Sequence, residues 1–194
     1  MVRITTERLL LREMSESDYD ALNAVLGDAE NMRFYPHGFD GERVRNWIQR
    51  NIARYRIFGF GLWAVCLKEC GTVIGDCGLT MQNMNGSILP EIGYHIARTH
   101  QRKGYAGEAA RAVRDWTFTH TPFGEVYSYM KKENRASSAT ARANGMRFRT
   151  AFTDREGEIS EVYAITRTEW NALTSAILAE REKPAECFRG GEES

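Results

Sequence analysis

Hydrophobic positions along the chain follow two patterns, one typical of strands and one typical of helices. Short apolar runs that end at charged or turn-forming residues predict strands. Such runs lie at residues 7–14, 60–67, 72–80, 89–97, 125–130, 147–152 and 159–165. Apolar residues that recur every three or four positions predict helices. These patterns lie at residues 19–26, 44–55, 104–120, 135–144 and 166–177.

Residues that commonly begin or end such elements support these boundaries. Gly145 follows the fourth helical pattern, where a residue without a Cβ is best able to end a helix. Thr166 and Glu169 match a capping box at the start of the last helix. Asn85-Gly86 is a favoured pair for a tight turn between two strands. The sequence therefore predicts several of the turns as well as the elements.

The order of these elements predicts one mixed α+β domain. The three strand patterns within residues 60–97 follow one another directly, which favours antiparallel hairpins. The strand–helix–strand order within residues 89–130 favours a parallel pair. We assign residues 1–178 to this domain, with helices flanking a central sheet. Residues 179–194 are charged and small, and we expect a flexible polar tail there.

Length and charge narrow the possible functions. A chain of 194 residues is close to the usual size of one domain. Its 26 basic and 26 acidic residues cancel and are interleaved. Because non-specific nucleic-acid binders and anionic-membrane binders usually carry a basic excess, we expect neither partner. No apolar run approaches the ~20 residues that span a bilayer, and the N-terminus lacks the apolar core of a secretion signal. We expect a cytoplasmic protein.

The cysteines give little sign of a metal site. Cys66, Cys70 and Cys77 are close in sequence but lack the paired short spacings of a structural zinc site. We expect ordinary reduced thiols and no bound metal. An unusual metal site or a redox switch is the alternative.

The segment at residues 101–108, Q-R-K-G-Y-A-G-E, is the most informative part of the chain. It opens a predicted helix, where free N–H groups and the positive end of the helix dipole attract an anion. Gly104 would let the ligand approach the backbone, while Arg102 and Lys103 would add positive charge. The segment has neither the dinucleotide-binding nor the P-loop pattern. It predicts a site for a pyrophosphate-like anion, with a plain glycine-rich turn as the alternative.

Four motifs resemble the GNAT (Gcn5-related N-acetyltransferase) superfamily, in its RimJ/RimL-type branch. Q-R-K-G-Y-A resembles the signature that binds the pyrophosphate of acetyl-CoA. The other three are I-T-T-E-R-L-L-L-R, E-I-G-Y-H-I and E-N-R-A-S-S-A-T-A-R-A-N-G-M. The similarity covers about residues 4–170. It implies the GNAT acyl-CoA N-acyltransferase fold, with a mixed sheet of about seven strands splayed between the fourth (residues 89–97) and the fifth (residues 125–130).

The resemblance also implies where acetyl-CoA binds. Its pantetheine arm would lie in the splay against the backbone of Tyr94, His95 and Ile96, where an N–H group could stabilise the oxyanion. Asn134 would cap a helix and bind the pantetheine amide, and Ser137 would face the departing sulfur. The pyrophosphate would lie against Gln101, Arg102, Lys103, Gly104, Tyr105, Ala106 and Gly107.

The resemblance assigns the catalytic roles to Glu91 and Ser137. Glu91 would deprotonate the amine, directly or through water. Since an unperturbed glutamate has a pKa of about 4.3 and an α-amine one of about 7.7–8.0, direct transfer requires burial that raises the pKa of Glu91. Binding of the ammonium alone is the alternative, and His95 and His37 are the other candidate bases. Ser137 would stabilise the thiolate as a hydrogen-bond donor, or serve merely as a helix-start serine.

Phe34, Tyr35 and His37 lie where related proteins build the acceptor pocket, although aromatic residues there could equally pack in the core. The resemblance implies an enzyme that transfers the acetyl group of acetyl-CoA to a primary amine by direct attack in a ternary complex. The acceptor would be a protein N-terminal α-amine or a small amine. The enzyme would act as a monomer or a homodimer. The alternative function is a catalytically silent acyl-CoA-binding module.

Overall fold

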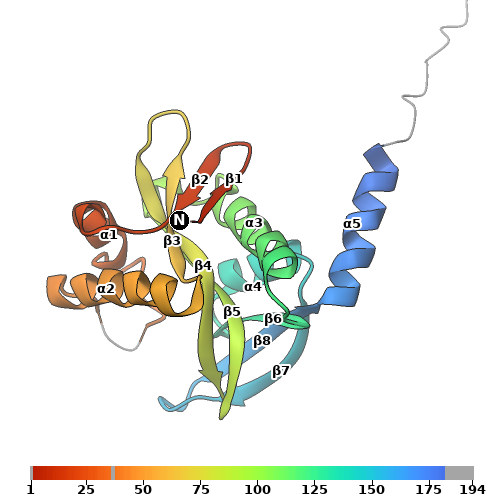
Figure 1. The fold of residues 1–194 in the computed structure, drawn as a ribbon. Coiled ribbons are helices and arrows are strands. Elements are labelled where there is room, and N and C mark those ends of the chain that lie inside the picture. The colour runs from red at the N-terminus through yellow and green to blue at the C-terminus, as the bar shows by residue number, and fades with distance from the viewer. Residues whose placement is uncertain (1, 36–37, 182–194) are drawn as a thin grey trace, which may run out of the picture.

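The computed structural model describes residues 2–35 and 38–181, which form one eight-stranded sheet with helices on both faces (Figure 1). The strand order is β1-β2-β3-β4-β5-β6-β8-β7. β5 and β6 are parallel, and the other neighbouring pairs are antiparallel. The strands are β1 (Arg3–Thr5), β2 (Leu9–Arg12), β3 (Leu62–Leu67), β4 (Val73–Met84), β5 (Ser87–Ile96), β6 (Glu125–Lys131), β7 (Arg147–Thr153) and β8 (Ile159–Thr166).

The described residues also form five α-helices and two short 3-10 helices. They are α1 (Tyr19–Leu26), α2 (Gly41–Phe58), α3 (Tyr105–His120), α4 (Arg135–Ala143), α5 (Arg167–Arg181), η1 (Glu16–Asp18) and η2 (Arg98–His100). The expected capping box is present, because Thr166 and Glu169 each accept a hydrogen bond from the other's backbone N–H. Within the described residues, no helix has the length and apolar character needed to cross a membrane.

The α+β class and the mixed sheet agree with the prediction, but the sheet has one more strand. The additional strand is β1, which pairs with β2 through Ile4 and Leu11. It has only three residues, of which Ile4 alone is buried, so it leaves almost no periodic signal. Helix α5 reaches Arg181, beyond the domain boundary expected at residue 178, and residues 182–194 lie outside the described part.

β5 and β6 diverge after a single registered pair, Glu91 with Tyr127. The predicted splay therefore lies between these two strands. Close to it, the Ser128 hydroxyl of β6 donates a hydrogen bond of 2.7 Å to the carbonyl oxygen of Ile92. The divergence leaves part of one edge of β5 without a strand partner, although β5 is central in the sheet.

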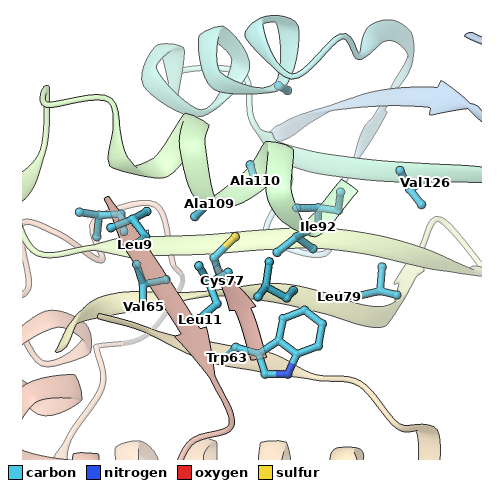
Figure 2. Packing of buried hydrophobic residues seen from close by; sticks show 14 of the residues in the cluster. Leu9, Leu11, Trp63, Val65, Cys77, Leu79, Ile92, Ala109, Ala110 and Val126 are labelled. Carbon is cyan, nitrogen blue, oxygen red and sulfur yellow. The ribbon is translucent and has the colours of Figure 1, made fainter. Parts of the chain in front are cut away.

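The sheet separates two hydrophobic cores. One packs α3 and α4 against strand residues, and Figure 2 labels ten of its members: Leu9, Leu11, Trp63, Val65, Cys77, Leu79, Ile92, Ala109, Ala110 and Val126. The other packs α1 and α2 against the opposite face. Because side chains alternate along a strand, Trp63 and Ala64 of β3 belong to different cores.

The three neighbouring cysteines do not form one group. Cys66 is buried in the core beneath α1 and α2, whereas Cys77 is buried in the core beneath α3. Cys70 is exposed, and its thiol lies 3.1 Å from the Thr72 hydroxyl. Cys66, Cys70 and Cys77 are therefore close in sequence but do not share one site in the structure.

Two positions of β4 require glycine because neighbouring backbones come very close. A Cβ on Gly75 would lie 1.9 Å from the carbonyl oxygen of His95, and one on Gly78 would lie 2.1 Å from that of Gly61. Neither neighbour is a flexible side chain that could move aside. The packing of β4 between β3 and β5 thus depends on the absence of a side chain at both positions.

We expect Gly78→Ala to lower the free energy of unfolding by about 2–3 kcal/mol or more, since the added methyl group must displace backbone. Gly124→Ala is the matched control, because a Cβ there would meet no atom within 4 Å. Its change should stay within about 0.5 kcal/mol. Denaturant unfolding of the three proteins measures both changes. Equal stability of the Gly78→Ala and control proteins would contradict the close approach of β3 and β4.

Candidate active site

The loop between β5 and α3 presents open backbone at the start of a helix. Gly104 occupies the N-cap position of α3 in the left-handed region, with φ 84°, and no described side chain caps this end. Arg102 also has a positive φ, 63°. An uncapped helix start leaves N–H groups for a phosphate. A Cβ on Gly104 would lie 3.3 Å from Nη2 of Arg8 and would fill part of the cradle, so the loop fits a pyrophosphate group.

Arg8, from the N-terminal segment before β2, supports this loop. Its Nη1 donates a 3.0 Å hydrogen bond to the carbonyl oxygen of Lys103. Its Nε donates a 2.7 Å hydrogen bond to Glu108, and its guanidinium lies 4.6 Å from the ring centre of Tyr105. In the sequence, Arg8 has no predicted role beyond its place in the motif I-T-T-E-R-L-L-L-R. A contact across about a hundred residues leaves no local sequence signal.

The other residues of the loop play different structural parts. Arg102 and Lys103 are exposed. Gln101 turns back to the protein, where its Nε2 donates hydrogen bonds to Oδ1 of Asn31 at 2.6 Å and to the carbonyl oxygen of Ile96 at 3.0 Å. Gln101 thus ties the loop to β5 and to the segment after α1. Ala106 and Gly107 lie in the first turn of α3 and keep it free of bulk.

The free edge of β5 exposes alternate backbone groups. The carbonyl oxygens of Ile92 and Ile96 point away from β4, because they accept bonds from Ser128 and Gln101. Since backbone groups of a strand alternate in direction, Tyr94 directs its N–H and C=O to the same side. His95 lies in the opposite phase, with its carbonyl against β4 at Gly75. The structure therefore brings Tyr94 and Ile96 to the splay but turns the backbone of His95 away from it.

Asn134 and Ser137 meet at the start of α4, next to the splay. Asn134 is the N-cap residue, and its side chain accepts a 3.1 Å hydrogen bond from the N–H of Ser137. The Tyr94 hydroxyl lies 3.0 Å from Oγ of Ser137 and donates to its carbonyl oxygen at 3.0 Å. From the sequence, only the backbone of Tyr94 was expected to contribute, because the strand register that directs its side chain toward α4 is a tertiary feature.

Glu91 lies on the other face of β5, which packs toward α2. Its side chain is partly buried, and Oε2 accepts a 3.2 Å hydrogen bond from the Thr80 hydroxyl. Burial raises the pKa of Glu91 to about 7, while Thr80 and the positive charges of His95 and Arg54 oppose the rise. A carboxyl group with a pKa near neutrality can accept and release a proton at physiological pH.

Tyr35 lies close to this carboxyl group, while the other aromatic candidate does not. Desolvation, and then the negative charges of Glu91 and Asp76, raise the pKa of Tyr35. The ring of Phe34 instead packs under the guanidinium of Arg33, 4.6 Å away. His37, the third predicted acceptor residue, lies outside the described residues.

A second buried carboxyl group, unnoticed in the sequence, lies beside Tyr35. Asp76 is completely buried, and its Oδ1 is 2.7 Å from Nδ1 of His95. Nε2 of His95 is 2.6 Å from the hydroxyl oxygen of Tyr35, and the Trp47 indole donates to Oδ2 of Asp76 at 2.8 Å. Asp76 lies within the strand predicted at residues 72–80 and looks there like any other polar strand residue. Only its complete burial in the structure distinguishes it.

Comparisons with known proteins agree with this arrangement. The family model described as an acetyltransferase (GNAT) domain matches residues 8–147. The protein YkkB of Bacillus subtilis (strain 168) is 33% identical over 147 residues, which cover 75% of this chain and 86% of YkkB. The N-acetyltransferase YnaD of the same organism is 28% identical over 176 residues, which cover 88% of this chain and 100% of YnaD.

Two solved structures share the fold. The GNAT-family acetyltransferase from Bacillus anthracis is 25% identical, with a TM-score of 0.74 that covers 86% of this chain and 99% of that protein. RimL, a ribosomal L7/L12 alpha-N-protein acetyltransferase in complex with coenzyme A, is 20% identical, with a TM-score of 0.71 over 85% of this chain and 98% of RimL. The match to the family model spans most of the chain, and the sheet and the glycine loop agree with it. The chain therefore belongs to the GNAT family and is an acetyl-CoA-dependent N-acetyltransferase.

Proposed function

We propose that the protein acetylates α-amines, such as the N-terminus of a protein, and that Glu91 accepts the proton of the incoming amine. The observation that carries this proposal is the half-buried position of Glu91 on β5, where Thr80 donates a hydrogen bond to its carboxyl group and burial raises its pKa to about 7. That pKa lies roughly one unit below the pKa of an α-amine, which is about 7.7–8.0. It lies more than about three units below the pKa of a lysine amine, which is about 10.4. Since each pKa unit corresponds to about 1.36 kcal/mol, transfer of a proton to the same base costs roughly 3.5 kcal/mol more from a lysine ammonium than from an α-ammonium.

The positions of the other groups support a direct transfer. The ammonium gives a proton to Glu91, and the free amine attacks the carbonyl carbon of the thioester. The backbone N–H of Tyr94, at the free edge of β5, stabilises the oxyanion. The C–S bond then breaks as the nitrogen loses its second proton, and the thiolate leaves toward Ser137, which donates a hydrogen bond to it. The sulfur takes up one proton to give the free thiol, so each turnover releases one proton to solvent.

Tyr94 serves this last step by holding Ser137. Burial raises the pKa of Tyr94 to about 12, although its hydrogen bond to Ser137 opposes the rise. A phenol of that pKa stays protonated beside a thiolate whose conjugate thiol has a pKa of about 8.5. Tyr94 is therefore a donor that fixes Ser137 and not the acid that protonates the sulfur.

RimL supports the α-amine assignment only through its fold. RimL is a ribosomal L7/L12 alpha-N-protein acetyltransferase, and its structure contains coenzyme A. A protein of this fold can thus bind coenzyme A and act on the α-amine of a protein.

An acceptor panel tests the proposed function. We expect peptides with a free N-terminus to release thiol from acetyl-CoA with a kcat/KM at least about tenfold above that of the same peptides with a blocked N-terminus and one free lysine. Polyamines complete the panel. A preference for polyamines would assign a small-amine acceptor, and saturable binding of coenzyme A without thiol release from any amine would indicate a silent binder.

A valine at position 104 tests the pyrophosphate loop. We expect Gly104→Val to weaken coenzyme A binding at least about tenfold, because the side chain strains a left-handed position and fills the cradle. Gly157→Val is the matched control, since Gly157 also has a positive φ, 81°, but lies in the turn between β7 and β8 with open space around it. Calorimetric titration with coenzyme A measures both. Normal binding by the Gly104→Val protein would remove the loop from the site.

The third test concerns the base. We expect the kcat/KM of the wild type to rise through pH 7 as Glu91 loses its proton, and Glu91→Gln to lose this limb. The loss should shrink as the pH approaches the pKa of the amine, where free amine needs no base. Glu42→Gln, an exposed change on α2, is the control. An equal loss at every pH would make Glu91 a substrate-positioning group.

Stability measurements test the burial of Glu91 independently of activity. Because its pKa is higher in the folded than in the unfolded state, the folded state holds the proton more tightly and loses stability as pH rises from about 4.5 through about 7. Glu91→Gln removes this loss. The variant should therefore gain about 1–3 kcal/mol relative to wild type between pH 5 and pH 8.5. No change in the difference between the two proteins would show that Glu91 is solvated.

A further inference from the structure

Gly93 lies in the middle of β5, at a position where its own backbone does not require a glycine. Its φ is outside the left-handed region, and the register of β5 with β4 continues through the Gly93–Gly78 pair without a bulge. Gly75 and Gly78 on β4 differ, since a Cβ on either would collide with neighbouring backbone. A glycine inside a strand lowers stability and often marks a place where a ligand approaches closely. The proposed reaction steps do not use Gly93.

The carboxyl group of Glu91 lies over Gly93. The three atoms nearest to a Cβ on Gly93 would be Oε2, Oε1 and Cδ of Glu91, at 3.3, 3.6 and 3.7 Å. Glu91 and Gly93 are alternate residues of β5, so they share the face toward α2. The Glu91 side chain therefore runs along the strand, and the absence of a side chain at residue 93 leaves room for its carboxyl group.

The space over Gly93 is open to solvent, although β5 is a central strand. Gly93 and its two neighbours on this face, Glu91 and His95, are all partly exposed. The next residue along the strand, Tyr94, directs its N–H into the splay, where we place the thioester carbonyl. An acceptor that reaches both the Glu91 carboxyl group and a thioester in the splay must therefore lie over Gly93.

The side of this opening away from Glu91 is formed by a fixed side chain, that of His95. Its Nδ1 lies 2.7 Å from Oδ1 of the completely buried Asp76, and its Nε2 lies 2.6 Å from the hydroxyl oxygen of Tyr35. The Trp47 indole holds the other oxygen of Asp76. Because both ring nitrogens have partners, the imidazole is held in one orientation and does not move aside for an acceptor.

We propose that Gly93 is a specificity-determining residue, over which the α-carbon of the acceptor lies between the Glu91 carboxyl group and His95. The size of the substituent on that carbon then selects the substrate, so that peptides with a small first side chain react best. This inference rests on the proposed function, since it places an α-amine at Glu91. It narrows the substrate class from α-amines in general to those next to an unsubstituted or lightly substituted carbon.

Competition for one space is the physical basis of this selection. A methyl group on residue 93 and a substituent on the acceptor α-carbon would share the opening beside the Glu91 carboxyl group. Overfilling a packed space is unfavourable, and one methylene group in a pocket changes kcat/KM by about 10–200-fold. The nearest neighbour of such a methyl group is the end of a flexible side chain, so the fold tolerates it.

The test uses Gly93→Ala in the full chain, with two peptides that differ only in a first residue of glycine or leucine. We expect kcat/KM for the leucine peptide to fall at least about tenfold more than kcat/KM for the glycine peptide. Binding of coenzyme A should stay within about twofold of wild type. A merely structural role for Gly93 would lower both peptides by the same factor.

Gly124→Ala is the matched control, because it adds the same methyl group where a Cβ meets no atom within 4 Å. It should behave as wild type with both peptides. Circular dichroism of each variant shows whether it folds.

The wild type provides a second measurement that needs no variant. Its kcat/KM should fall from a glycine-first through an alanine-first to a leucine-first peptide, by at least about tenfold over the series. This series decides the question if Gly93→Ala fails to fold.

Three results would overturn the inference: unchanged kinetics in Gly93→Ala, an equal loss for both peptides in the folded variant, or a wild type that prefers the leucine-first peptide. Failure of the proposed function looks different. In that case the wild type would show no preference for the α-amine over a lysine amine, whatever the first residue of the peptide.

Discussion

The divergence of β5 from β6 is the constraint on which the rest of the site depends. Backbone groups inside a protein need partners, so two central strands can separate only where other groups satisfy their edges. Ser128 and Gln101 do this for the carbonyl oxygens of Ile92 and Ile96. The backbone of Tyr94 lies between these two points and faces the splay, where an extended ligand can add to the sheet like another strand.

Strand β5 therefore presents the groups for the amine and the groups for the leaving thiolate on opposite faces. Because side chains alternate, Tyr94 points toward α4 and Ser137, while Glu91 and His95 point toward α2. The groups that we assign to the leaving thiolate lie on one face, and those that we assign to the amine lie on the other. β4 holds β5 in this orientation, since Gly75 and Gly78 let its neighbours come within a distance that no side chain would permit.

The carboxyl groups of Asp76 and Glu91 differ in how many donors they have. Asp76 has a donor on each oxygen, from His95 and from Trp47. Glu91 has the hydroxyl of Thr80 and is partly exposed. A carboxyl group with few donors favours its neutral form as burial increases, which suits Glu91 to proton transfer. The two hydrogen bonds of Asp76 instead hold the imidazole of His95 and the indole of Trp47 in place.

The sequence by itself determined every α-helix and strand except the short β1, the α+β class and the glycine loop, because each leaves a local signal: periodic apolar residues, capping residues, or a glycine where a helix begins. The resemblance of its motifs to a known family implied the splay. The motif residues also led to the family. Only the tertiary structure decided how Arg8 braces the loop, that Tyr94 reaches Ser137, that His95 faces Asp76 instead of the splay, and that burial raises the pKa of Glu91 to about 7. Each of these depends on strand register or burial between segments far apart in the chain, and neither quantity is encoded in the local pattern of polar and apolar residues.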